Sequence, residues 1–220
     1  MVVTDNQTPY RTRKVRFLNG AHTANVLASI LGGLTFVDEM MNDPVFGKMV
    51  RKAIYGEIFH TVNLPENEKQ FFADSIVERF LNPFAQHRLL SISLNSVSKW
   101  KVRVLPSLLD YTELKGELPA VLAFSLAALL RFYRLTVDAD GKASGSYNGI
   151  TWPVSDSEDV IRFFAGISGE PVAEYVRKAL ANTAFWEMDL NTVPGLTDYV
   201  TAKLEAIDGI GIRDAVKTVL

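Results

Sequence analysis

The feature that most constrains the fold is a run of apolar residues near the middle of the chain. Residues 119–130 are apolar except for Ser125, and Arg131 follows directly. A membrane-spanning helix needs about 20 such residues, so this run is too short to cross a bilayer. It is typical instead of a helix that is buried on all sides in a protein interior. The sequence therefore predicts a buried helix, with other helices packed around it.

Proline and its polar neighbours mark where further helices begin and end. Asp43 directly precedes Pro44, which is the order of a capping side chain and a first helical residue. The expected helices cover residues 14–32, 44–59, 65–82, 85–97, 102–115, 119–135, 156–166, 171–182 and 194–207, and a short last helix follows Gly209-Ile-Gly211. We therefore expect an all-α, multi-helix fold.

One segment breaks the helical pattern. Residues 138–153 contain three glycines and two aspartates, which is turn composition, and we expect a surface loop or a short hairpin there. The start Asp138-Ala-Asp140-Gly141 is similar to a calcium-binding loop, but the later ligands are absent. We therefore expect no bound metal.

Composition excludes several classes of function. With 220 residues, 48% of them hydrophobic, the chain can bury one sizeable core, and we expect a single domain over residues 1–220. A net charge of -2 gives no field for nucleic acid or a membrane. The chain has no cysteine, which excludes disulfides. Residues 1–16 are polar and basic and do not resemble a signal peptide, so we expect a cytoplasmic protein.

Lys14, Asn19 and His22 form the main candidate site. On an α-helix, which turns about 100° per residue, Asn19 and His22 lie about 140° and about 80° from Lys14. All three would then project from one half of the helix. Such a group suits proton transfer at an alcohol or carbonyl oxygen, with the lysine as acid or base and the other two side chains holding the oxygen. The alternative is a solvated basic helix start with no chemistry.

An ordinary lysine is too basic for this role, so its pKa must be lowered. Burial penalises the ammonium form, and nearby cations act in the same direction. Three arginines surround Lys14 in the sequence: Arg11, Arg13 and Arg16.

A second candidate group follows later in the chain. Lys99, Lys101 and Arg103 could bind a substrate carboxylate, which lysine does as a point charge and arginine with two hydrogen bonds. On a helix, Lys99 and Arg103 share a face and Lys101 points about 200° away, whereas an extended segment would align all three. A solvated basic helix start is again the alternative. His87 is a weaker substrate-binding candidate, because a lone histidine near an Asn-Pro turn often only satisfies a helix end.

Several of these motifs together resemble a known family. They comprise residues 8–23 (TPYRTRKVRFLNGAHT), 42–44 (NDP), 79–84 (RFLNPF) with His87, 90–95 (LSISLN) and 99–106 (KWKVRVLP). In these motifs the chain resembles the C-terminal domain of the polyol-specific long-chain dehydrogenases, the mannitol dehydrogenase family. The likeness is close over the first half of the chain and looser after it.

The resemblance implies specific roles. Lys14 would be the general acid/base, Asn19 would polarise the reacting oxygen, and His22 would hydrogen-bond the reacting region of the substrate. Lys99 would be the basic residue that binds substrate. The family has a glutamate in a proton path three residues before the lysine, whereas this chain has Arg11, so that path does not carry over.

The resemblance also implies a reaction and a missing part. The implied enzyme is an NAD-dependent oxidoreductase that acts on a sugar acid or a polyol. The first choice of reaction is the interconversion of tagaturonate and altronate. The alternatives are fructuronate with mannonate, or a polyol such as mannitol. No strand, glycine-rich turn and helix for NAD occurs in the sequence. We therefore expect an N-terminal dinucleotide-binding domain that precedes residue 1, and an isolated chain that is folded but inactive. A competing interpretation is a non-catalytic helical interaction module.

Overall fold

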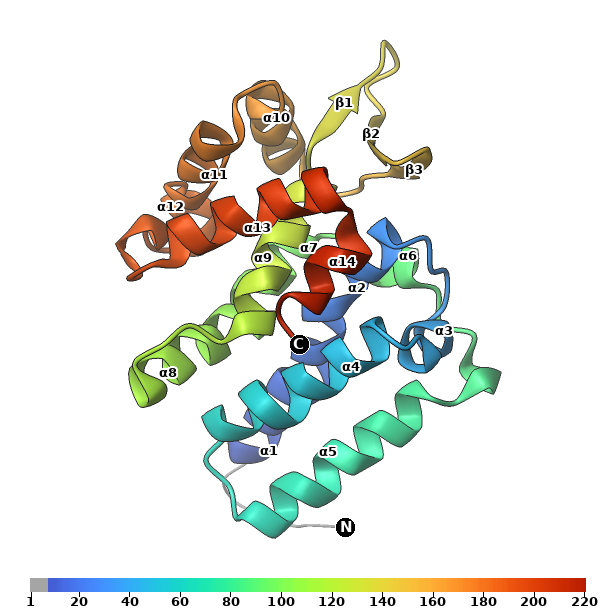
Figure 1. Ribbon diagram of the computed structural model, residues 1–220, viewed down its shortest axis with the longest axis vertical. Coiled ribbons are helices and arrows are strands. Elements are labelled where there is room, and N and C mark those ends of the chain that lie inside the picture. Colours follow the sequence, from blue (N-terminus) through green and yellow to red (C-terminus); the bar gives the residue numbers. More distant parts are fainter. Residues whose placement is uncertain (1–7) are drawn as a thin grey trace.

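The computed structural model describes residues 8–220, and most of them are helical (Figure 1). Residues 1–7 of the expected domain lie outside the described residues. The first helical segments are α1 (Thr8–Arg13), η1 (Lys14–Gly20), α2 (Ala21–Leu31), α3 (Val37–Asn42), α4 (Phe46–Arg51), η2 (Lys52–Glu57), η3 (Ile58–Thr61), α5 (Glu66–Phe80), η4 (Pro83–Ala85) and α6 (Leu89–Ile92). The later ones are α7 (Ser96–Arg103), α8 (Leu105–Lys115), α9 (Ala120–Phe132), α10 (Glu158–Ile167), α11 (Val172–Leu180), α12 (Thr183–Trp186), η5 (Leu190–Thr192), α13 (Leu196–Ile210) and α14 (Ile212–Lys217). The expected multi-helix fold is confirmed.

The apolar run forms α9, the helix at the centre of the core. All residues from Val121 to Leu130 are buried, and α2 and α13 both pack against α9. Its one polar interior residue, Ser125, accepts a hydrogen bond from the Trp100 indole N–H at 2.8 Å and donates one to the Leu122 carbonyl. Because a buried polar group is costly only when unpaired, Ser125 fits in this core.

The first turn of α9 is held by a carboxylate from another helix. Glu57 is 2% exposed, and its two carboxylate oxygens accept hydrogen bonds from the backbone N–H groups of Val121 and Leu122, both at 2.8 Å. These N–H groups have no partner inside their own helix. Glu57 therefore links η2 to the central helix.

The glycine-rich segment lies in a small antiparallel sheet of three strands in the order β1 (Leu135–Val137), β2 (Ala143–Tyr147) and β3 (Ile150–Pro153). Gly145 pairs with Trp152, and a Cβ at Gly145 would lie 2.5 Å from the Trp152 ring nitrogen. Only glycine therefore leaves room for the indole. The Tyr147 hydroxyl donates to the Ile207 carbonyl and accepts from the Ile212 N–H, which ties the sheet to α13 and α14.

Several expected helices differ from the structure. The one expected over 44–59 is divided into α4, the π-helix η2 and the 3-10 helix η3. Residues 14–20 form a π-helix between α1 and α2, in place of a uniform α-helix over 14–32. The expected helix over 85–97 is replaced by a turn, the short α6 and the start of α7, because Gln86 and Asn95 adopt left-handed backbone conformations with φ of 39° and 53°. At Asp43 the expected cap is confirmed, since its Oδ1 accepts from the Val45 and Phe46 N–H groups.

None of the described helices combines the length and the apolar character that crossing a bilayer requires.

Candidate functional site

Lys14 and Asn19 both lie in η1, and the π-helix changes how they are placed. In a π-helix each carbonyl is bonded to the N–H five residues later, so residues five apart lie about one turn apart. Lys14 and Asn19 are five residues apart. The angle between their side chains about the helix axis is therefore smaller in the π-helix than the value of about 140° expected for an α-helix. Single π-turns are frequent at functional sites.

Lys14 itself is exposed in the described chain. The burial that we expected for Lys14 is therefore not provided by residues 8–220. Asn19 is partly buried, and its backbone carbonyl accepts a hydrogen bond from the Thr23 hydroxyl at 2.8 Å. That bond anchors the junction between η1 and α2.

His22 lies one turn further on, in the first turn of α2. Its ring stacks on Phe80 with centroids 3.9 Å apart and planes at 10°. Its Nε2 atom is buried without a hydrogen-bond partner. Burial, followed by the charges of His87, Arg79 and Arg103, lowers the pKa of His22 to about 3. The imidazole is therefore neutral near neutral pH, with one buried polar atom still able to bind a ligand.

His87 faces His22, and both side chains line one small cavity. The two imidazole centroids are 5.7 Å apart at an angle of 87°. The cavity has a volume of about 110 Å³, and Arg79, Phe80 and Asp38 also contribute to its walls. His87 is positioned by its backbone, because its carbonyl accepts from the Val37 N–H at 3.0 Å. The structure thus brings together two of the predicted site residues.

Gly20 lets α7 approach this part of the chain closely. A Cβ at Gly20 would lie 2.8 Å from the backbone carbonyl oxygen of Arg103, closer than real side chains come. Arg103 is the last residue of α7, and its charge is one of those that lower the pKa of His22. The end of α7 therefore lies beside the Asn19–His22 segment.

Lys99 and Arg103 share one face of α7. The Lys99 ammonium donates to the Ile92 carbonyl at 2.9 Å. Burial, and next the charge of Arg103, lower the pKa of Lys99, and burial lowers the pKa of Arg103. Two partly buried cations one turn apart are a suitable site for a carboxylate.

Lys101 is separate from this pair. Its ammonium forms an ion pair with Glu187 at 2.8 Å, next to α12. Residues 99–103 are helical, not extended, so Lys101 points away from Lys99 and Arg103.

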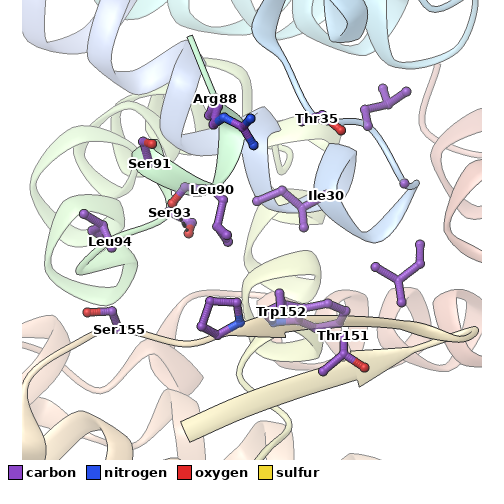
Figure 2. Close-up of a pocket in the computed structure, with 14 residues that line it drawn as sticks. Ile30, Thr35, Arg88, Leu90, Ser91, Ser93, Leu94, Thr151, Trp152 and Ser155 are labelled. Atoms are coloured by element: carbon purple, nitrogen blue, oxygen red, sulfur yellow. Dashed lines mark hydrogen bonds between the residues drawn. The ribbon is translucent and has the colours of Figure 1, made fainter. Parts of the chain in front are cut away.

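A larger cavity lies on the other side of the segment that carries His87. The Phe36–Arg88 bridge joins this segment to residues 35–37, and neighbouring side chains there point to opposite sides. The cavity has a volume of about 600 Å³ and mainly apolar walls from α2, α6 and β3. Figure 2 shows Ile30 and Leu90 on one side of it and Trp152 on the other.

Three residues of the site were not selected from the sequence. Arg79 and Phe80 lie beside His22, and both belong to the motif of residues 79–84 that carries the resemblance. That motif was the only sequence signal for them. Asp156, which contacts the start of α7, follows the glycine-rich segment and had no signal at all.

Comparison with known proteins identifies relatives across almost the whole chain. The sequence profile of the mannitol dehydrogenase C-terminal domain family matches residues 6–208. Altronate oxidoreductase of Pectobacterium atrosepticum is 45% identical over 221 residues, which cover 98% of this chain. Altronate oxidoreductase of Escherichia coli is 41% identical over 223 residues, which cover 99%.

Solved structures share the fold. A ternary complex of Pseudomonas fluorescens mannitol 2-dehydrogenase with NAD and D-mannitol matches 98% of this chain and 41% of its own, with a TM-score of 0.83 and 22% identity. A substrate-free D-sorbitol dehydrogenase matches with a TM-score of 0.70 and 19% identity. The chain spans 44% of the length of the altronate oxidoreductases that it matches.

Proposed function

Because the chain belongs to the mannitol dehydrogenase C-terminal domain family, we propose that it is the substrate-binding and catalytic part of a cytoplasmic oxidoreductase that interconverts tagaturonate and altronate. The named relatives, altronate oxidoreductases at 40–45% identity, support this choice of substrate. A hexuronate carries a carboxylate, and the partly buried pair Lys99 and Arg103 is the observation in the structure that carries the proposal.

In this proposal the proton is carried by Lys14. As ammonium it protonates the carbonyl oxygen of tagaturonate, and as amine it accepts the hydroxyl proton of altronate. Asn19 donates a hydrogen bond to the same oxygen, which is supported by its place about one turn after Lys14 in η1. The free Nε2 of His22 binds the neighbouring part of the substrate.

The described residues do not fit a dinucleotide. Their strands form one antiparallel sheet, whereas a dinucleotide site needs parallel strands with a glycine-rich turn before a helix. We propose that NAD is held mainly by an N-terminal dinucleotide-binding domain, and that this domain also covers the exposed Lys14. "Complete enzyme" below means this chain together with that domain. The isolated chain is then inactive.

The test replaces Lys14 with alanine in the complete enzyme. Losing a general acid/base lowers kcat by about 10²- to 10⁴-fold, and the exposed side chain leaves folding intact. The control is Lys48→Ala, which removes an exposed lysine from α4. Unchanged kcat in Lys14→Ala would contradict the assignment.

Other substrates of the same class are distinguished by kinetics. Fructuronate with mannonate, and uncharged polyols such as mannitol, are the alternatives. The ranking of kcat/KM over these compounds decides between them, and a preference for mannitol would remove the need for the Lys99–Arg103 carboxylate site.

A non-catalytic interaction module is the candidate from another class. The observation in its favour is the mainly apolar cavity of about 600 Å³, which is large enough for a small ligand or an inserted side chain. Activity of the complete enzyme with any sugar acid would rule this alternative out.

A further inference from the structure

Asp156 connects the segment after β3 to the first turn of α7, the helix that carries Lys99. Its Oδ2 accepts a hydrogen bond from the Tyr133 hydroxyl at 2.5 Å and a longer one from the Val97 N–H at 3.4 Å. Its Oδ1 accepts from the Ser157 N–H at 2.8 Å. The carboxylate is therefore held on both oxygens.

Tyr133 completes the connection from the central helix. It is fully buried at the end of α9, and its hydroxyl accepts from the Ser96 N–H at 3.2 Å while it donates to Asp156. Burial, followed by the charge of Asp156, raises the pKa of Tyr133, which keeps the hydroxyl a donor. The two side chains thus bind successive N–H groups of α7.

These contacts replace a cap that α7 lacks. Asn95 precedes the helix in a left-handed conformation, and its side chain makes no capping hydrogen bond. The first N–H groups of a helix need partners from elsewhere. Ser96 and Val97 find them in Tyr133 and Asp156, so these two residues fix where α7 begins.

The same carboxylate acts on the charge of Lys99. Burial and the charge of Arg103 lower the pKa of Lys99, whereas the charge of Asp156 raises it. An ammonium has three donors, and the Ile92 carbonyl uses one of them. The remaining donors are the ones a substrate carboxylate can use.

We propose that Asp156 is a positioning residue for substrate binding, which together with Tyr133 fixes the first turn of α7 and so holds the Lys99 ammonium in place for the substrate carboxylate. This inference rests on the proposed function. It assigns a role to a residue that touches neither the substrate nor the reacting atoms.

The test compares steady-state kinetics of variants of the complete enzyme with altronate. Asp156→Asn is expected to raise KM about tenfold and to leave kcat within about twofold, because substrate binding weakens while Lys14 is untouched. Tyr133→Phe keeps the ring and is expected to raise KM about threefold. Glu187→Gln is the matched control: it breaks the Lys101 ion pair on the other side of α7 and should leave KM unchanged.

A second comparison separates positioning from general stability. If Asp156 acts through Lys99, then adding Asp156→Asn to Lys99→Met raises KM by less than about twofold beyond Lys99→Met alone. A full tenfold rise in that background would overturn the proposal. The proposal would also be overturned if Lys99→Met raised KM but Asp156→Asn and Tyr133→Phe both left KM unchanged. If Lys99→Met itself leaves KM unchanged, the carboxylate site of the proposed function fails, and this inference fails with it.

Discussion

The ring of His22 stacks on the ring of Phe80, which lies 58 residues later in the chain, with centroids 3.9 Å apart and planes at 10°. This packing fixes the imidazole against α5 and leaves its buried Nε2 without a partner. A neutral ring is required, because a charged one would lose its hydration there. The geometry that prepares His22 for a ligand therefore also makes the stability of the folded chain depend on pH.

The first prediction concerns the pH dependence of stability. The pKa of His22 is lowered to about 3 in the folded chain, whereas an unfolded histidine titrates near 6.5. Between these values the unfolded chain binds more protons, so the stability that the neutral ring contributes is present above pH 6.5 and is lost as the pH falls. At pH 5 the loss amounts to about 2 kcal/mol. Urea unfolding at pH 7 and pH 5 measures it.

The matched variant is His22→Phe, which keeps an aromatic ring against Phe80 and removes the titration. Between pH 7 and pH 5 the free energy of unfolding of this variant should fall about 2 kcal/mol less than that of the unchanged chain. An equal fall in both proteins would show that His22 is not the titrating group.

The second prediction concerns the close approach at Gly20. In Gly20→Ala the new Cβ would meet the Arg103 carbonyl at 2.8 Å, so η1 and α7 must move apart. We expect a loss of about 1 to 3 kcal/mol in the free energy of unfolding, as for an overpacked core. Gly166→Ala, in α10, meets nothing within 4 Å and should instead gain about 0.5 to 1 kcal/mol. Thermal unfolding of both variants tests this, and equal effects would contradict it.

Much of the helical framework follows from local sequence signals. The apolar run predicts the buried α9, and Asp43 before Pro44 predicts a cap that the structure contains. The π-helix over residues 14–20 was not predictable, because it has no local signal in the sequence; it lies where the carbonyl of Arg103, from another helix, approaches Gly20. The left-handed Asn95 is a similar case.

The candidate site was only partly predictable for the same reason. Periodicity showed that Lys99 and Lys101 would separate if their segment were helical, but it could not decide between a helix and a strand. The partners Phe80 and Asp156 come from distant parts of the chain, and tertiary packing alone brings them to His22 and α7. The roles of Lys14 and Asn19 remain predictions.

The third prediction follows from the two faces of α7. Lys101→Met should leave KM for altronate within about twofold in the complete enzyme, because its ion pair with the exposed Glu187 lies away from Lys99. Its free energy of unfolding should fall by about 0 to 1 kcal/mol, the usual range for a surface ion pair. A rise in KM as large as that of Lys99→Met would place Lys101 in the site after all.

The last prediction concerns the buried carboxylate that holds the central helix. Glu57→Ala leaves the N–H groups of Val121 and Leu122 buried without partners, and each such group costs about 1 to 3 kcal/mol. We expect the free energy of unfolding to fall by about 2 to 5 kcal/mol. Glu57→Gln keeps one acceptor oxygen and should lose less.

Glu117→Ala provides the control, because Glu117 is an exposed carboxylate close to the same end of α9. Its removal changes the local charge but breaks none of the bonds that Glu57 makes, and it should cost less than about 0.5 kcal/mol. Chemical denaturation of the three variants of the isolated chain gives the ranking. If Glu57→Ala were as stable as Glu117→Ala, the two backbone N–H groups would have found other partners, and Glu57 would not be what fixes the start of the central helix.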